Sequence, residues 1–319
     1  MLLILSENQD QSTNFVIDWL LFSNILFSRV NGDIDFLHCE ININRHNEVT
    51  IEIENREKMI LLLNQFTSFW YRRNNYTIVS PIVKTLKRHV AFALKKEWLQ
   101  IQQFIHYYFN DKKKLGSFEK ENTHNKLISM AKASEAGFNI PLTLITTKKE
   151  NLLAFLSINE GITKAIWNMF TIKTTKLFQS ISTKAVKEAH TIHLSDILSP
   201  VLIQKNISKA YELRIFFIKE DIYPMAIFSQ TDTKTQIDFR NYNRQKPNRN
   251  IPFSLPSVVK NRVLNFIKIM DLDTGSIDII VTPTNEFVFL EVNPIGQFGW
   301  LSTNCNYYLE EKIANYFIN

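Results

Sequence analysis

The sequence predicts a mixed fold that begins as α/β and ends as α+β. Residues 2–5 form a short apolar run, followed by a polar turn and an amphipathic stretch from Thr13 to Phe22. Strand, loop and helix in this order are typical of the start of an α/β domain. Strand patterns dominate the chain after residue 199. Its 319 residues exceed the roughly 250 at which one hydrophobic core stops growing, so we expect more than one domain.

The first predicted segment covers residues 1–116. Ser12 or Thr13 can cap its first helix. Residues 32–83 alternate polar and β-branched side chains, and residues 86–109 follow a long helical pattern that ends in a charged stretch.

The second predicted segment covers residues 117–198. We expect Thr123 to cap a helix over residues 124–136, with Gly137 where a helix C′ residue belongs. A strand, a helix and a further strand follow. The third segment, residues 199–319, is expected to form strands at residues 201–207, 212–218, 223–229, 276–281 and 287–292.

The composition excludes several classes of protein. Hydrophobic residues make up 45% and charged residues 21%, so the chain is not mainly disordered. The net charge of +6 favours a polyanionic ligand, but the basic residues are dispersed, and we expect no nucleic-acid partner. No segment approaches the roughly 18 apolar residues of a membrane-spanning helix. Cys39 and Cys305 form no CxxC pair and no secretion signal is evident, so we expect reduced thiols and a cytoplasmic location.

The most informative stretch is a predicted β-hairpin over residues 276–293. If Thr284 and Asn285 form a two-residue loop, counting back along both strands from that loop places Asp278 directly opposite Glu291. Asn293 then shares the face of Glu291. Two directly opposed carboxylates destabilise a hairpin unless a positive charge lies between them, and Mg²⁺ takes oxygen ligands of this kind. The alternative is a solvated face whose acids only keep the protein soluble.

Two lysines add to this pattern. Lys164 lies among apolar residues in the predicted strand at 162–167, and Lys126 lies in the first turn of the predicted helix. Each alone is compatible with a surface lysine. Beside a metal-binding hairpin, both suit contacts with phosphate. The pair Arg72-Arg73 either meets an acidic peptide or forms a solvated face.

Several motifs, in their order along the chain, resemble those of ATP-grasp ligases. They comprise Lys126, Lys164, the strand Val201–Ile207, Tyr-Glu212-Leu-Arg214, Asp238-Phe-Arg240 and Asp278…Glu291-Val-Asn293. The C-terminal stretch Phe289–Trp300, the opening Leu5-Ser-Glu-Asn and the stretch Trp70–Arg73 narrow the resemblance to the ATP-grasp peptide maturases of ribosomal peptide pathways, the microviridin or graspetide type, and within them to the grasp-with-spasm branch.

This resemblance implies an ATP-grasp fold with an N-terminal pre-ATP α/β domain, a small central lid and a C-terminal antiparallel-sheet domain. It implies that Lys126 and Lys164 contact the ATP phosphates and that Glu212 holds the ribose. The stretch from Gln204 through Lys205 to Ile207 would form the adenine hinge. Asp278, Glu291 and Asn293 would bind one or two Mg²⁺ ions, and Arg214 and Arg240 would steady the transferring phosphate or the acidic side chain of the peptide. One departure is the lack of glycine in residues 168–191, where such ligases often have a glycine-rich loop. This segment, rich in Ser, Thr and Lys as in Thr171–Lys176, is nevertheless the expected lid segment.

The resemblance implies that ATP activates an Asp or Glu side chain of a ribosomal precursor peptide as an acylphosphate. A Ser or Thr of the same peptide would then close an ω-ester macrolactone. Amide formation, as a lactam or by amino-acid addition, and a non-catalytic scaffold that binds the leader remain alternatives. The implied partners are the precursor peptide, a radical SAM/SPASM protein of the same pathway and a second copy of the chain.

Overall fold

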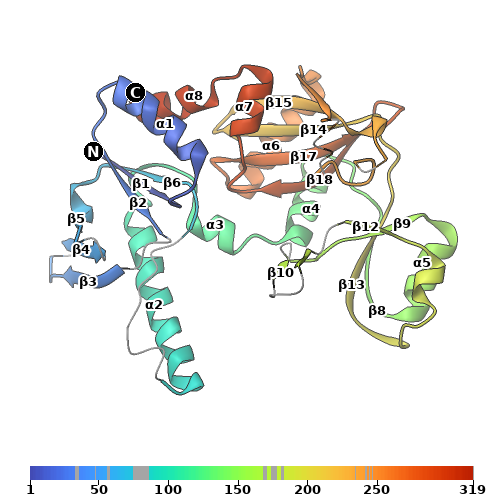
Figure 1. Cartoon of the computed structure of the whole chain (residues 1–319), viewed down its shortest axis with the longest axis horizontal. Helices are drawn as coiled ribbons and strands as arrows, with labels where there is room; N and C mark the ends of the chain where they lie inside the picture. The colour runs from blue at the N-terminus through green and yellow to red at the C-terminus, as the bar shows by residue number, and fades with distance from the viewer. Residues whose placement is uncertain are drawn as a thin grey trace. The chain divides into compact units, whose positions relative to one another are not determined.

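The computed structural model describes residues 1–32, 36–46, 48–55, 58–74, 86–167, 171–173, 178–180, 183–233, 235–240, 243, 245 and 247–318. The described residues form two compact units. The first comprises residues 1–123, 272–275 and 294–319, and the second comprises residues 124–271 and 276–293 (Figure 1). The predicted division at residues 116/117 and 198/199 stays a prediction.

The first unit is built on a parallel sheet with the strand order β2-β1-β6-β7. Strand β1 (Leu2–Ser6) is buried along its whole length, as the apolar run predicts for a central parallel strand. The other strands are β2 (Phe27–Asn31), β6 (Ser68–Tyr71) and β7 (Lys113–Leu115). The helices of this unit are α1 (Gln11–Phe22), α2 (Arg88–Tyr108), α3 (Phe118–Asn122), α7 (Gly299–Cys305) and α8 (Leu309–Ile318).

A second, antiparallel sheet completes the core of the first unit. It consists of β3 (Phe36–Ile43), β4 (Val49–Asn55) and β5 (Ile60–Leu62), with the short helix η1 (Leu63–Gln65) after it. Its apolar face joins the core that the parallel sheet and α2 share, for example through Ile51 and Ile53. The predicted alternation between residues 32 and 83 is therefore confirmed for the strands that the structure describes.

Two expectations for the first unit are wrong. Helix α1 is capped by Asp10, whose carboxylate accepts from the Thr13 amide at 3.1 Å, and not by Ser12 or Thr13. The Arg72-Arg73 pair does not form a solvated face. Arg72 is buried, with its Nε 3.3 Å from Asp10 Oδ2, and Arg73 Nε lies 2.9 Å from the same oxygen. Asp10 thus serves as both helix cap and counter-ion.

The second unit contains a five-stranded sheet with the order β16-β15-β14-β17-β18. Its strands are β14 (Tyr211–Ile218), β15 (Asp221–Phe228), β16 (Arg249–Pro252), β17 (Thr274–Val281) and β18 (Phe287–Asn293); the first two residues of β17 belong to the first unit. The short helix η4 (Ser229–Thr231) follows β15. Helices α4 (Lys126–Glu135) and α6 (Ser257–Met270) pack together beside β18, where Phe266 and Phe138 both meet the ring of Phe289.

A smaller sheet with the order β12-β9-β13-β8 forms the rest of the second unit. Its strands are β8 (Thr143–Lys148), β9 (Gly161–Thr163), β12 (Lys184–Val186) and β13 (Ile197–Lys205). Helix α5 (Lys149–Ile158) packs on it through Leu152 and Phe155, and the short helix η3 (Glu188–Thr191) follows β12. Strands β10 (Thr171–Lys173) and β11 (Phe178–Ser180) pair separately. Residues 168–170, 174–177 and 181–182 of the expected lid segment lie outside the described residues.

The start of α4 differs from the prediction. Asn125, not Thr123, caps the helix and accepts from the amides of Leu127 and Ile128. Gly137 follows the C-cap with φ +92°, as the sequence predicts for a C′ residue. Among the described residues, no helix combines the length and the apolarity that a bilayer crossing needs.

Candidate active site

The β17–β18 hairpin has the predicted pairing at its functional end. Asp278 lies opposite Glu291, and Ser276 lies opposite Asn293. The predicted two-residue loop is nevertheless wrong. The turn closes between Thr282 and Glu286, and beyond Asp278 the register shifts by one residue. This β-bulge offsets the longer loop, and bulges of this kind are common beside active sites.

Three adjacent strands bring charged side chains to the same region. Arg214 on β14 approaches Asp278 on β17, with Nη1 3.3 Å from Oδ2. Arg240 approaches Glu291 on β18, with Nη1 3.5 Å from Oε1. The cations therefore balance the opposed carboxylates without a metal, so charge repulsion alone does not require one.

Burial and these cations together shift the pKa values of Asp278 and Glu291 in opposite directions. Burial raises the pKa of Asp278, and the Arg214 guanidinium only partly opposes it. Burial would also raise the pKa of Glu291, but the positive charges of Lys164 and Arg240 outweigh it and lower that pKa. At neutral pH Glu291 is thus held as a carboxylate beside a more weakly acidic partner.

The two predicted lysines lie in the same neighbourhood. Lys164 is not within a strand, because β9 ends at Thr163; it follows the strand and lines the pocket described below. Burial lowers its pKa, and the charge of Glu291 opposes that shift. Lys126 is the first residue of α4, and its Nζ donates to the carbonyl oxygens of Ala165 at 3.2 Å and Trp167 at 2.8 Å. Lys126 therefore holds the chain that follows Lys164.

The predicted nucleotide residues flank the end of β13 and the start of β14. The Gln204 amide is buried and donates to Thr143 Oγ1 at 2.8 Å. The backbone amide of Lys205 donates to Leu142 O at 2.9 Å. Glu212 is buried on the same strand face as Arg214, and its pKa is raised by burial although Lys209 opposes that shift.

One pocket in the second unit collects most of these side chains. Of the eleven predicted site residues, eight line it: Lys164, Gln204, Lys205, Ile207, Glu212, Arg240, Asp278 and Glu291. Arg214 reaches it through its ion pair with Asp278. Lys126 and Asn293 are not among the lining residues; Lys126 contacts the segment after Lys164, and Asn293 lies two residues beyond Glu291 on β18.

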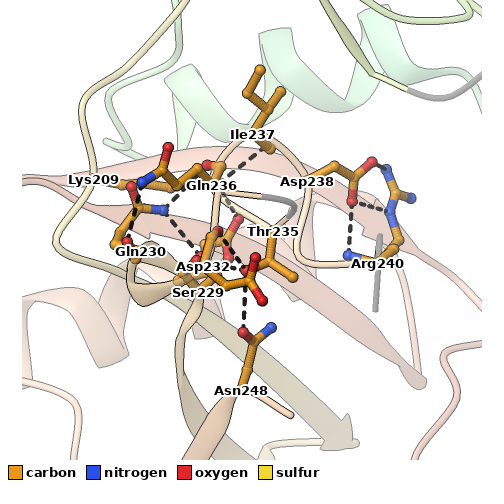
Figure 2. A network of polar contacts seen from close by, with 11 residues as sticks. Lys209, Ser229, Gln230, Asp232, Thr235, Gln236, Ile237, Asp238, Arg240 and Asn248 are labelled. Carbon is orange, nitrogen blue, oxygen red and sulfur yellow. Dashed lines mark hydrogen bonds and ion pairs between the residues drawn. The ribbon is translucent and has the colours of Figure 1, made fainter. Parts of the chain in front are cut away.

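The site also contains two residues, Asp238 and Lys209, to which the sequence analysis gave no role. Asp238 binds Arg240 through two hydrogen bonds, Nε to Oδ1 at 2.8 Å and Nη2 to Oδ2 at 2.9 Å (Figure 2). Lys209 forms a buried ion pair with Glu212. Asp238 lies within the motif Asp238-Phe-Arg240, so its spacing from the arginine is a signal that could have revealed it.

The oxygen atoms of Asp278, Glu291 and Asn293 are chemically suited to bind a hard cation. Asp278 Oδ1 is buried and has no hydrogen-bond partner among the described residues. Two carboxylates and the Asn293 amide oxygen form the type of oxygen donor set that Mg²⁺ prefers. The described residues contain no cluster of three or more Asp, Glu, His or Cys suited to a metal, so a site here depends on the asparagine and on ligands from outside the chain.

The arrangement of these sheets is that of the ATP-grasp fold, as known structures confirm. Neither protein-family models nor curated proteins give a match. Among solved structures, a Chryseobacterium gregarium RiPP-associated ATP-grasp ligase in complex with ADP and a leader and core peptide is 25% identical, with a TM-score of 0.82. The match covers 99% of this chain and 94% of that one.

Two further structures have the same fold. The macrocyclase MdnC from Microcystis aeruginosa, bound to the precursor peptide MdnA, is 24% identical with a TM-score of 0.77 over 100% of this chain and 99% of its own. The ATP-grasp ligase PsnB, complexed with minimal precursor, Mg and ADP, is 14% identical with a TM-score of 0.74 over 99% and 96%. The predicted resemblance to ATP-grasp ligases of ribosomal peptide pathways is confirmed, and the narrower grasp-with-spasm branch stays a prediction.

Proposed function

We propose that the protein is an ATP-dependent ligase that activates Asp or Glu side chains of a ribosomal precursor peptide and joins them to Ser or Thr of the same peptide. The observation that carries this proposal is the pocket in which two opposed carboxylates lie beside Lys164 and Arg240. The similar structures support it, because one holds ADP with a leader and core peptide and another holds Mg and ADP.

The side chains of the pocket have distinct roles in this proposal. Lys164 and Arg240 bind the phosphoryl oxygens, and Lys126 fixes the segment that follows Lys164. Arg214 holds Asp278 in place. Gln204, Lys205 and Ile207 bind the adenine, and Glu212 binds the ribose. One or two Mg²⁺ ions, held by Asp278, Glu291 and Asn293, would offset negative charge on the phosphoryl oxygens.

The proposed chemistry has two steps. An oxygen of the peptide carboxylate attacks the γ-phosphorus of ATP, the bond to ADP breaks, and an acylphosphate forms. The Ser or Thr oxygen then attacks the acyl carbon, the bond to phosphate breaks, the hydroxyl proton leaves with the phosphate, and an ω-ester macrolactone results. Preorganised positive charge lowers the barrier of the first step, because charge develops on the transferring oxygens.

Two alternatives concern the product and the role of the chain. A lysine or a free amino acid as nucleophile would give an amide. A scaffold that only binds the leader has no need of opposed, buried carboxylates paired with arginines, so the geometry of Asp278 and Glu291 favours the enzyme. A radical SAM/SPASM partner, a homodimer and a cytoplasmic location belong to the same proposal.

The direct test is the intact mass of a precursor peptide from the same pathway, co-expressed with and without this protein. We expect the loss of one water per ring, reversed by mild base because esters hydrolyse there. A loss that survives base would indicate a lactam, and a gain in mass would indicate amino-acid addition. An unchanged peptide together with a protein that binds no ATP would contradict the enzyme. The matched control is the variant Asp278→Asn/Glu291→Gln, which should leave the peptide unchanged.

A further inference from the structure

Lys209 is a buried lysine with two partners in different parts of the second unit. Its Nζ lies 2.5 Å from Glu212 Oε1, and the side chains of both residues are 6% exposed. The same Nζ donates to the carbonyl oxygen of Ile237 at 3.2 Å (Figure 2). A single ammonium group therefore contacts the predicted ribose carboxylate and the backbone just before Asp238.

Ile237 belongs to the segment of residues 229–240, of which all but residue 234 are described. Polar contacts within this segment stabilise it. Thr235 Oγ1 donates to Ser229 O at 2.7 Å. The side-chain amides of Gln230 and Gln236 each donate to the backbone carbonyl of the other, at 3.2 and 3.3 Å (Figure 2). Bonds of this kind keep the segment compact, so a contact at Ile237 affects the placement of its end.

The end of the segment presents Arg240 to the reaction site. Asp238 holds the Arg240 guanidinium in a bidentate pair and also accepts from the Arg240 backbone amide at 3.0 Å. Bidentate pairs fix the orientation of the guanidinium plane as well as its position. In this orientation Nη1 of Arg240 faces Glu291 Oε1. Contacts thus run from Glu212 through Lys209 and Ile237 to Asp238, Arg240 and Glu291.

We propose that Lys209 is a positioning residue that couples nucleotide binding at Glu212 to the placement of Arg240. The proposal rests on the proposed function. Without the ammonium group, the buried Glu212 carboxylate loses its counter-ion and the Ile237 carbonyl loses a donor. A nucleotide that orders Glu212 then no longer stabilises the segment that carries Arg240. Because coupling between two sites is reciprocal, loss of this link weakens nucleotide binding as well.

A purely structural role for Lys209 makes a different prediction. In that case its removal lowers the stability of the whole second unit, and any ADP that binds has its ordinary effect on residues 229–240. The coupling role predicts instead that ADP binds and the segment does not respond. The two roles are therefore separated by measuring the segment at saturating ADP.

The test uses the full chain with ADP and MgCl₂. Calorimetry gives the ADP affinity, and hydrogen exchange gives the protection of residues 229–240 with and without ADP. The variants are Lys209→Met, the conservative Lys209→Arg, and the control Lys268→Met, which removes an exposed lysine of α6 in the same unit. If Lys209→Met does not fold, Lys209→Gln, which keeps a donor without the charge, replaces it.

In the wild type we expect ADP to slow exchange in residues 229–240. In Lys209→Met we expect about tenfold weaker ADP binding, which corresponds to about 1.4 kcal/mol, and no added protection at saturating ADP. Lys209→Arg should recover much of both effects, and Lys268→Met should match the wild type. Full ADP-dependent protection in Lys209→Met would overturn the coupling while leaving the proposed function intact. A wild type that binds no ADP would overturn both.

Discussion

Removal of the Arg214 guanidinium should destabilise the second unit markedly. Arg214 and Asp278 side chains are 11% and 8% exposed, so solvent screens their interaction little. Arg214→Met leaves the Asp278 carboxylate buried, with only the more distant cations of the site to balance it. Breaking a buried pair from one side costs about 3–5 kcal/mol, and we expect the lower end, about 3 kcal/mol, because Arg240 and Lys164 still interact with the Asp278 charge.

The assay is urea unfolding of the full chain in EDTA, followed by fluorescence and circular dichroism to check that both probes report one transition. The second variant is Arg214→Met/Asp278→Asn, which removes both charges. It should recover most of the lost free energy of unfolding, because no unpaired charge stays buried. A loss below about 1 kcal/mol in the single variant, or no recovery in the double variant, would refute the electrostatic account of the site.

Three further predictions concern other parts of the chain. Lys164→Ala should weaken ATP binding by about 2 kcal/mol through loss of a charge-assisted contact, measured by calorimetry with Lys268→Ala as the control. Equal ATP affinities of the two variants would contradict a contact between Lys164 and the phosphates. Burial lowers the pKa of His106 from 6.5 to about 3, so the unfolded chain binds a proton first as the pH falls. The contribution of His106 to stability should therefore drop by about 2 kcal/mol between pH 7 and 5, measured as the difference between the wild type and His106→Gln in urea titrations at the two pH values. Gly116→Ala should destabilise the first unit in thermal unfolding, because φ is +79° and an added Cβ would lie 2.1 Å from Tyr71 O; an unchanged melting temperature would contradict this.

The pairing of Asp278 with Glu291 was predicted from an assumed two-residue loop over Thr284 and Asn285, between two apolar runs that indicated a hairpin. All eight residues of β17 are buried, so alternation between a buried and an exposed face does not determine the register of this hairpin. The length of the turn could not be predicted. A longer loop and a bulge cancel each other at Asp278, and the sequence pattern alone does not distinguish this pair from a two-residue loop without a bulge.

Contacts between residues far apart in sequence explain why Arg72, Arg73 and Lys209 were misplaced or missed. Two adjacent arginines such as Arg72 and Arg73 are typical of a protein surface, but both form ion pairs with Asp10, which is distant in sequence. Lys209 lies only three residues before Glu212, but its second partner, the Ile237 carbonyl, is distant in sequence, and no local pattern indicates that contact. Partners of this kind depend on the tertiary fold, whereas periodicity and caps report only local structure.

The helix cap of α4 shows the limit of local signals. Thr123 and Asn125 are both residue types that cap helices, and both precede the same apolar pattern. The structure selects Asn125, whose side chain accepts from the amides of Leu127 and Ile128. The later start makes Lys126 the first residue of α4, from which its Nζ reaches Ala165 and Trp167.

The most direct test of the central claim is ADP formation by the purified protein with ATP, MgCl₂ and a precursor peptide from the same pathway. The account predicts ADP formation that requires the peptide and is lost in the variant Asp278→Asn/Glu291→Gln. That variant should keep its circular dichroism spectrum. Turnover that persists in the double variant, or a wild type that forms no ADP with a peptide it demonstrably binds, would contradict the account.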